Sequence, residues 1–240
     1  MSTTIDPDLS LGELALERPE LARIFDELRL DYCCGGSVSL AAAAAQHGLD
    51  ERTLVSTLEA GVRAGDAILG ERDWREVPLA RLCEHIVYRH HAFLRRELPR
   101  IEELLAEVVA RHGSTQPTLV GLQGDFLDLY GDLLDHIDQE EEVLFPFCAG
   151  LDADAGPADR VLEQLRMHEA AHSDVGETLA RMREMAGGYD SSASLGTTHK
   201  VLLESLQGLE QDLHQHIHEE NNVLFRRLRD ELGEPAAATG

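Results

Sequence analysis

The sequence is poor in basic residues, in aromatic side chains and in cysteine. Against 45 aspartates and glutamates stand 21 lysines and arginines, so the formal net charge is −24 at pH 7. This charge repels phosphate backbones and anionic headgroups, which argues against nucleic acid or a membrane surface as a partner. The chain lacks an apolar run near the roughly 20 residues that a membrane helix needs, and its first residues do not resemble a signal peptide. We therefore expect a cytoplasmic protein.

The four cysteines do not form the spaced framework of a small secreted domain. Cys33 and Cys34 are adjacent, whereas Cys83 and Cys148 stand alone, so we expect reduced thiols. The adjacent pair lies in the string DYCCGG. Such a pair suits thiol exchange, metal transfer or contact with a partner's thiol, and a buried structural turn is an equally good interpretation.

Apolar residues recur at helical spacing along most of the chain, and strand-forming segments are sparse. In the N-terminal part the segments are short, and Ser37 or Ser39 and Asp50 are candidate helix N-caps. Four longer helical blocks follow a glycine-containing linker, and their short connecting loops favour an antiparallel bundle. The blocks are residues 79–112, 118–149, 158–185 and 197–232. The fold class is thus all-α, with a small helical domain (1–60), a linker (61–76) and a four-helix bundle (77–235).

The bundle contains an internal repeat. Residues 132–145 and 212–225 are identical at eight of fourteen positions. Each copy has a histidine and, four residues later, a glutamate, which lie on one face of a helix. A further histidine lies 45 residues before the histidine of the first copy and 44 before that of the second. The six candidate ligands are His91, His136, Glu140, His172, His216 and Glu220.

Two glutamates near an apolar core would repel each other and cost several kcal/mol unless cations neutralise them. Four imidazoles, two bridging carboxylates and one bridging oxygen fill most positions of two octahedral ions. Imidazole and carboxylate without thiolate suit iron or manganese better than structural zinc or calcium. Asp132 and Asp212 lie one turn before two of the histidines and are expected to accept their hydrogen bonds.

A second motif overlaps one of these histidines. Residues 168–172 read His-Glu-Ala-Ala-His, which fits the pattern of zinc proteases. We do not favour this interpretation because the segment follows a loop, its neighbours are polar and a closed bundle offers no substrate cleft.

Taken together, residues 11–15, the DYCCGG string and residues 216–225 resemble the iron-sulfur cluster repair di-iron proteins, the repair of iron centres family. These proteins join a short cysteine-containing domain to a hemerythrin-like bundle. The resemblance covers nearly the whole chain and implies the same six ligands, with two non-haem irons bridged by an oxo or hydroxo group. It also implies that Cys33 and Cys34 belong to a motif needed for activity or partner contact.

The function implied by the resemblance is repair of iron-sulfur clusters damaged by nitric oxide or peroxide, by supply of iron from a labile centre. The partners would be proteins with damaged clusters. Two other functions stay open: an enzyme that reduces nitric oxide, dioxygen or peroxide bound at the irons, and a hemerythrin-like sensor. A homodimer is also left open. Two departures are Arg226, where the family often has proline, and Ala171, where an acidic residue is common and Glu169 is a substitute.

Overall fold

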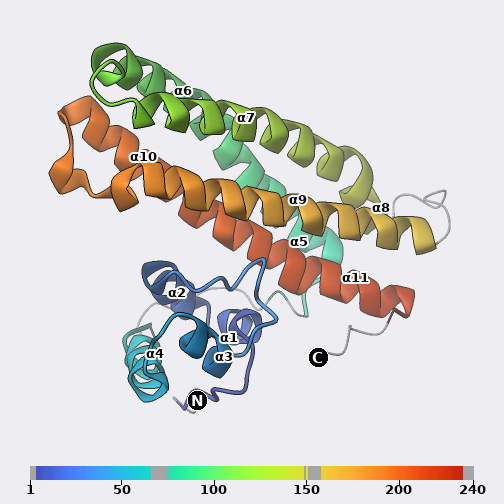
Figure 1. Ribbon diagram of the computed structural model, residues 1–240. Helices are drawn as coiled ribbons and strands as arrows, with labels where there is room; N and C mark the ends of the chain where they lie inside the picture. The colour runs from blue at the N-terminus through green and yellow to red at the C-terminus, as the bar shows by residue number, and fades with distance from the viewer. Residues whose placement is uncertain (1–3, 66–73, 75, 149, 151–157, 235–240) are drawn as a thin grey trace. The chain divides into compact units, whose positions relative to one another are not determined.

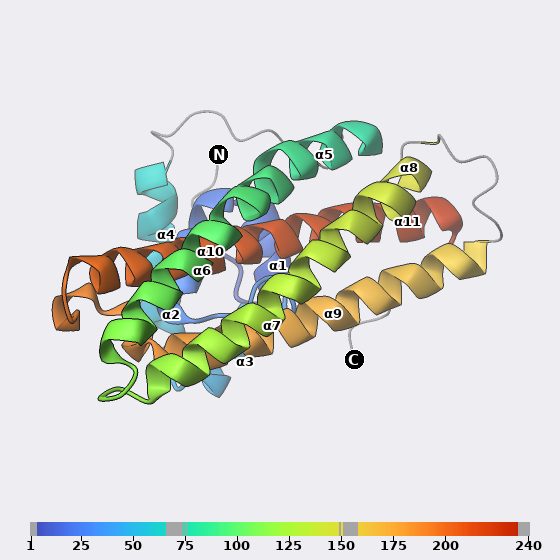
Figure 2. The same cartoon turned by 90° about the horizontal axis from the view of Figure 1, so that it is seen from above.

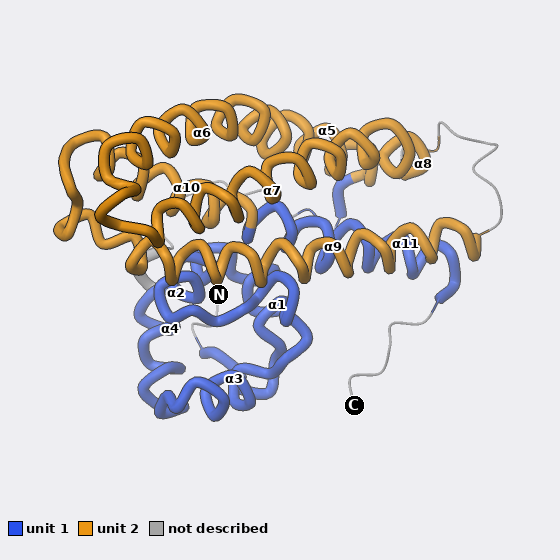
Figure 3. Tube along the Cα trace, turned by 45° about the horizontal axis from the view of Figure 1, so that its top comes forward, with its two compact units in different colours: residues 1–77, 214–240 blue, residues 78–213 orange. Residues whose placement is uncertain are grey.

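The structure is a computed structural model that describes residues 4–65, 74, 76–148, 150 and 158–234. These residues form helices and turns, with an isolated bridge between Ser10 and Ser39 and no strand among them. They divide into two compact units, coloured in Figure 3: unit 1 comprises residues 1–77 and 214–240, and unit 2 comprises residues 78–213. The boundary falls inside α10 (Thr197–His218), which therefore supplies residues to both units.

Unit 2 is an antiparallel four-helix bundle (Figures 1 and 2). Its long helices are α6, α7, α9 and the first part of α10, and successive helices run in opposite directions. The predicted all-α class and four helical blocks are confirmed; position 149 lies outside the described residues. The elements are α5 (Leu79–Ile86), η2 (Val87–His91), α6 (Ala92–His112), α7 (Thr118–Gln139), η3 (Glu140–Leu144), α8 (Phe145–Cys148), α9 (Ala158–Met185), η4 (Gly187–Tyr189) and η5 (Ser191–Ala193).

One apolar face of each long helix forms the core of unit 2. Leu98, Phe126, Leu206 and Leu209 are buried almost completely, and each recurs with apolar neighbours three or four residues away. Burying such a side chain contributes about 1.5–3 kcal/mol. No helix among the described residues has the length and apolar character needed to cross a membrane.

Unit 1 has a separate apolar core around Phe25, Leu40 and Leu58. The caps of its helices follow local sequence. Ser39 accepts a hydrogen bond from the backbone N–H of Ala42, so Ser39 and not Ser37 is the cap. Asp50 accepts one from Thr53, as predicted. The elements are α1 (Leu11–Glu17), η1 (Pro19–Leu21), α2 (Ala22–Leu28), α3 (Leu40–Gln46), α4 (Glu51–Gly65), η6 (Glu219–Leu224) and α11 (Phe225–Leu232).

Helix α4 continues to Gly65, into the segment expected to be a linker. Of the remaining positions of that segment, 66–73 and 75 lie outside the described residues. Within unit 1, the guanidinium of Arg227 donates hydrogen bonds to the backbone carbonyls of Trp74 and Val77.

The DYCCGG turn of unit 1 is held by backbone contacts that require glycine. A Cβ at Gly36 would lie 2.5 Å from the carbonyl oxygen of Tyr32, which no larger residue tolerates without a shift. On the C-terminal segment of the same unit, Asn221 and Asn222 each donate to the carbonyl oxygen of Cys33 over 3.3 Å. The turn is therefore fastened to η6.

Candidate metal centre

Three π-helical turns interrupt three of the four helical blocks that carry candidate ligands. His91 ends η2, Glu140 begins η3, and Glu220 lies in η6. A π turn inserts an extra residue into the helical ladder and is frequently found at functional sites. Both copies of the internal repeat have such a turn at the glutamate. The repeat is therefore one of backbone geometry as well as of sequence.

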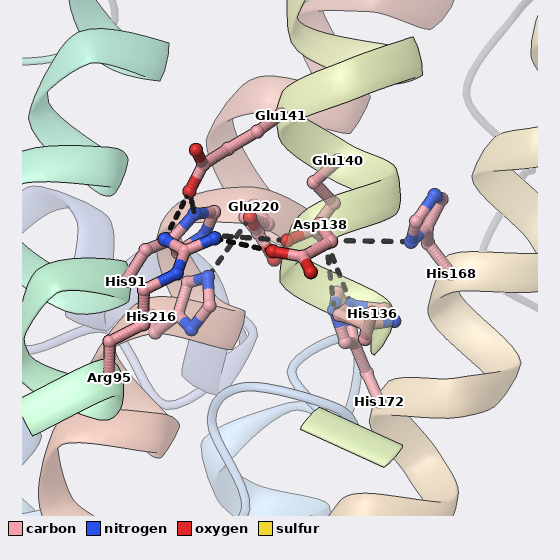
Figure 4. A network of polar contacts seen from close by, with 10 residues as sticks. All are labelled: His91, Arg95, His136, Asp138, Glu140, Glu141, His168, His172, His216 and Glu220. Atoms are coloured by element: carbon pink, nitrogen blue, oxygen red, sulfur yellow. Dashed lines mark hydrogen bonds and ion pairs between the residues drawn. The ribbon is translucent and has the colours of Figure 1, made fainter. Parts of the chain in front are cut away.

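In unit 2, Glu140 is fully buried and is surrounded by imidazoles (Figure 4). These imidazoles come from η2, α7 and α9, so three separate helical blocks converge on one carboxylate. Oε1 of Glu140 lies 2.8 Å from Nε2 of His136, 3.4 Å from Nδ1 of His168 and 3.9 Å from Nε2 of His172, and Oε2 lies 3.4 Å from Nε2 of His91.

This arrangement fits a bound cation. A buried carboxylate costs several kcal/mol unless positive charge or hydrogen bonds compensate it, and a cation held between it and the imidazoles supplies that charge. The Nε2 atoms of His136 and His172 lie 3.0 Å apart. Two nitrogens bound at right angles to one ion, each about 2.1 Å from it, have about that separation. The donor set of unit 2 is thus suited to a divalent metal with nitrogen and oxygen ligands.

His91 is oriented by groups that the sequence analysis did not single out. Its Nδ1 lies 2.8 Å from Oε1 of Glu141, and Arg95 donates to Glu141 and to Asp138 over 2.6 Å each. Burial raises the pKa of Glu141, but the hydrogen bonds from Arg95 and His91 outweigh it and hold that pKa below its ordinary value. A metal-ligating histidine commonly donates to a carboxylate through the ring nitrogen that does not bind the metal. In the sequence, the run of glutamates at 140–142 was the feature that could have indicated such a carboxylate.

The remaining two candidates, His216 and Glu220, belong to unit 1. Both side chains are buried, and Nε2 of His216 lies 3.1 Å from Oε1 of Glu220 (Figure 4). They repeat the spacing and the contact of His136 with Glu140. Unit 2 therefore contains four of the six candidate ligands, and unit 1 contains the other pair.

The accessory candidates lie in different environments. Asp132 is exposed, on the wall of a groove of about 580 Å³ between α7 and α9. Oδ1 of Asp212 lies 3.1 Å from Nδ1 of His90, and both residues are buried. Glu169 is half-buried, and its backbone carbonyl accepts a hydrogen bond from Ser173.

Neither His90 nor His168 is among the six candidate ligands, although the zinc-protease pattern contains His168. His168 lies one turn before His172 on α9, and this four-residue spacing was a usable signal for a shared face. Both histidines of the zinc-protease pattern therefore lie on the face of α9 that is near Glu140.

Cys33 is buried and Cys34 is half-buried, and both are reduced thiols. Their sulfur atoms lie 3.7 Å apart. The hydrogen bond to Cys34 and burial together raise the pKa of Cys33 well above its usual value. Since the thiolate is the reactive form, this environment is unfavourable for thiol exchange.

Two known domain families match this chain. Residues 84–228 match the hemerythrin HHE cation binding domain, and residues 7–61 match a domain of unknown function, DUF542. The iron-sulfur cluster repair protein YtfE of Pectobacterium atrosepticum is 35% identical over 227 residues, covering 93% of this chain and 98% of that protein. The chain belongs to the iron-sulfur cluster repair protein family. This confirms the resemblance found in the sequence.

Other members of the family are similarly related. The YtfE proteins of Pectobacterium carotovorum subsp. carotovorum and Escherichia coli O157:H7 are 37% and 33% identical, over 228 and 220 residues. These matches cover 93% and 92% of this chain and 98% and 96% of the two relatives. The similarity therefore extends through both the cysteine turn and the histidine-rich helices.

Proposed function

We propose that this protein repairs iron-sulfur clusters damaged by nitrosative or oxidative stress, by supplying iron from a labile non-haem di-iron centre. The observation that carries the proposal is the convergence of four imidazoles on the buried Glu140. Its relatives' designation as iron-sulfur cluster repair proteins supports the repair role.

The proposed ligands are the six residues identified in the sequence. In this proposal Glu140 and Glu220 would hold two irons together with an oxo or hydroxo group, and the histidines would complete the coordination. When bound, the irons serve both as the store and as the cargo. Nitrogen and oxygen donors without thiolate suit iron, and they leave it exchangeable toward the thiolates and sulfides of a damaged cluster. The ligands are His91, His136, Glu140, His172, His216 and Glu220.

Access for the cargo is provided by the groove between α7 and α9. His136 and His168 line it together with Gln139 and Gln164, and five aspartates against one arginine, Arg181, give it a net negative lining. A negative lining attracts cations and raises their local concentration. We propose that iron leaves and enters along this groove. The aspartates are Asp125, Asp128, Asp132, Asp135 and Asp174.

The proposed partners are proteins whose iron-sulfur clusters are damaged. Delivery of iron to a damaged cluster requires a reducing compartment. Such a compartment keeps the cysteines of the recipient protein, and Cys33 and Cys34 of this chain, as free thiols. We therefore propose the cytoplasm as the place where the protein acts.

The test combines metal content with repair. The wild-type chain is expected to hold about two irons and to restore activity to a cluster enzyme inactivated by nitric oxide or peroxide. Glu140→Ala should lose the iron and the repair, whereas Glu142→Ala, at an exposed neighbouring position, should keep both. One zinc per chain in place of iron, or full repair by Glu140→Ala, would refute the proposal.

A further inference from the structure

The turn at residues 31–36 presents three metal-binding side chains at one place. Ligand atoms of Asp31, Cys33 and Cys34 all lie within 4.8 Å of one another. All three belong to unit 1 and are different residues from the six histidine and glutamate ligands. We propose that Asp31, Cys33 and Cys34 form a second metal site, for a single thiophilic divalent cation such as Zn²⁺ or Fe²⁺.

The spacing of the donor atoms is that of tetrahedral coordination. Two thiolates about 2.3 Å from one ion lie about 3.8 Å apart at the tetrahedral angle, and a thiolate and a carboxylate oxygen lie about 3.5 Å apart. The Cys33 and Cys34 sulfurs are 3.7 Å apart, and Oδ1 of Asp31 is 3.4 Å from the Cys33 sulfur. The three side chains therefore need little rearrangement to bind.

The backbone holds the donors in this arrangement. Oδ1 of Asp31 accepts hydrogen bonds from the backbone N–H groups of Cys33 and Cys34, over 3.2 and 2.9 Å. A Cβ at Gly35 would lie 3.0 Å from Oδ2 of Asp31, so glycine leaves room for the carboxylate. The carbonyl of Cys33 is fixed from the other side by Asn221 and Asn222. The site is thus preorganised before any ion binds.

Exposure allows an ion to enter and to be passed on. Asp31 is exposed and Cys34 is half-buried, whereas Cys33 lies at the base of the turn with 5% of its surface exposed. Three protein ligands leave the fourth tetrahedral position open to water or to a ligand from another molecule. On binding, the two S–H protons pass to solvent and each sulfur donates an electron pair to the cation. No oxidant or reductant is required.

The raised pKa of Cys33 is consistent with this use of the pair. Without a cation the buried thiol stays protonated and unreactive, whereas a coordinated cation supplies the positive charge that stabilises the thiolate. The site therefore explains an adjacent pair in which the buried Cys33 is poorly suited to thiol exchange.

Cobalt(II) is the probe for the test, because thiolate ligation gives it an intense sulfur-to-metal charge-transfer absorption. The full chain, loaded with iron and kept reduced and anaerobic, is titrated with Co²⁺ while its iron content is monitored. We expect one equivalent of Co²⁺ to bind with this absorption. Cys33→Ser combined with Cys34→Ser should abolish it, and Cys83→Ser, at a buried cysteine of unit 2, should leave it unchanged.

Two further variants separate ligation from folding. Asp31→Asn keeps an oxygen that accepts the backbone hydrogen bonds but removes the charge, and should weaken Co²⁺ binding about tenfold or more. Cys34→Ser changes the half-buried position alone and should weaken binding while the thermal midpoint stays the same. Absence of the absorption in the wild type, its persistence in the double variant, or unchanged affinity in Asp31→Asn would overturn the proposal. Iron content and repair activity, measured without cobalt, test the proposed function separately.

Discussion

Glu140 illustrates how a single buried residue determines the chemistry of its surroundings. Its side chain has no exposed surface, and its two oxygens are distributed between imidazoles from three helical blocks. An ionised carboxylate in this position is tolerated when positive charge is nearby. Burial and donor type together therefore make the residue suited to a metal, whereas a surface His-x-x-x-Glu pair contributes only a few tenths of a kcal/mol.

Glu141 is predicted to control the affinity for metal without binding it. Glu141→Gln removes the negative charge beside Nδ1 of His91 and weakens the pair with Arg95. Because such supporting carboxylates fix the ligand histidine and raise its basicity, we expect a 10–100-fold loss of iron affinity. Competition with a chelator measures it. Glu142→Gln, at the exposed next position, is the matched control, and equal affinities in the two variants would contradict the role of Glu141.

Helical elements in this chain combine predictable ends with interruptions that are not predictable. Caps follow short-range rules, as the hydrogen bonds to Ser39 and Asp50 show. The π turns η2, η3 and η6 follow no comparable local pattern. Their unfavourable backbone geometry is stabilised by tertiary contacts of the displaced side chains, and these contacts are not local in sequence. Each of them contains one of the candidate ligands, His91, Glu140 or Glu220.

The cap of α3 gives a prediction for this element. Ser39→Ala removes the acceptor for the backbone N–H of Ala42 and should lower the free energy of unfolding by about 1 kcal/mol. Ser37→Ala, at an exposed position two residues earlier, should change it little. Chemical denaturation of the two variants checks the difference, and equal stabilities would show that Ser39 is not an effective cap.

For the whole molecule, we expect metal binding and folding to be coupled. Removing iron would leave a buried carboxylate without a cation. A ligand that binds only the folded state, present at a thousand times its Kd, stabilises that state by about 4 kcal/mol. We therefore expect chelation to lower Tm by on the order of 10 °C. Scanning calorimetry of loaded and stripped protein measures this shift. Glu140→Ala should show no such shift, and an equal Tm for loaded and stripped wild type would contradict a buried centre.

The cysteine turn and the iron ligands are expected to have separable roles. Cys33→Ala combined with Cys34→Ala leaves the backbone carbonyls that bind Asn221 and Asn222, so η6 should keep its contacts. The variant should hold two irons with an unchanged spectrum but lose most of its cluster repair, since the thiols are gone. Iron analysis and a repair assay on the same preparation check both statements. Repair at the full rate would make the pair a structural turn, and loss of iron would contradict the ligand assignment.

The sequence by itself determined the features that depend on near neighbours. Helical periodicity predicts blocks that agree with the structure at 79, 112, 118, 158, 185, 197 and 232, and the duplicated spacing of histidine and glutamate identifies six candidate ligands. These features are local because a helix is defined by contacts three and four residues apart. The same locality indicated Asp50 as a cap and narrowed the cap of α3 to Ser37 or Ser39, of which Ser39 makes the hydrogen bond.

Tertiary structure decided what depends on residues far apart in the chain. Glu141 meets His91 across 50 residues, and His168 meets Glu140 across 28, so helical periodicity, which places His168 on one face with His172, indicates neither contact. Sequence order places His216 and Glu220 after the linker with the other candidate ligands, yet the segment from 214 onward packs in one unit with residues 1–77. The contact of His214 with Asp26, over 2.7 Å and 188 residues, shows why. Which segments share a core is settled by complementary surfaces, which no short stretch of sequence specifies.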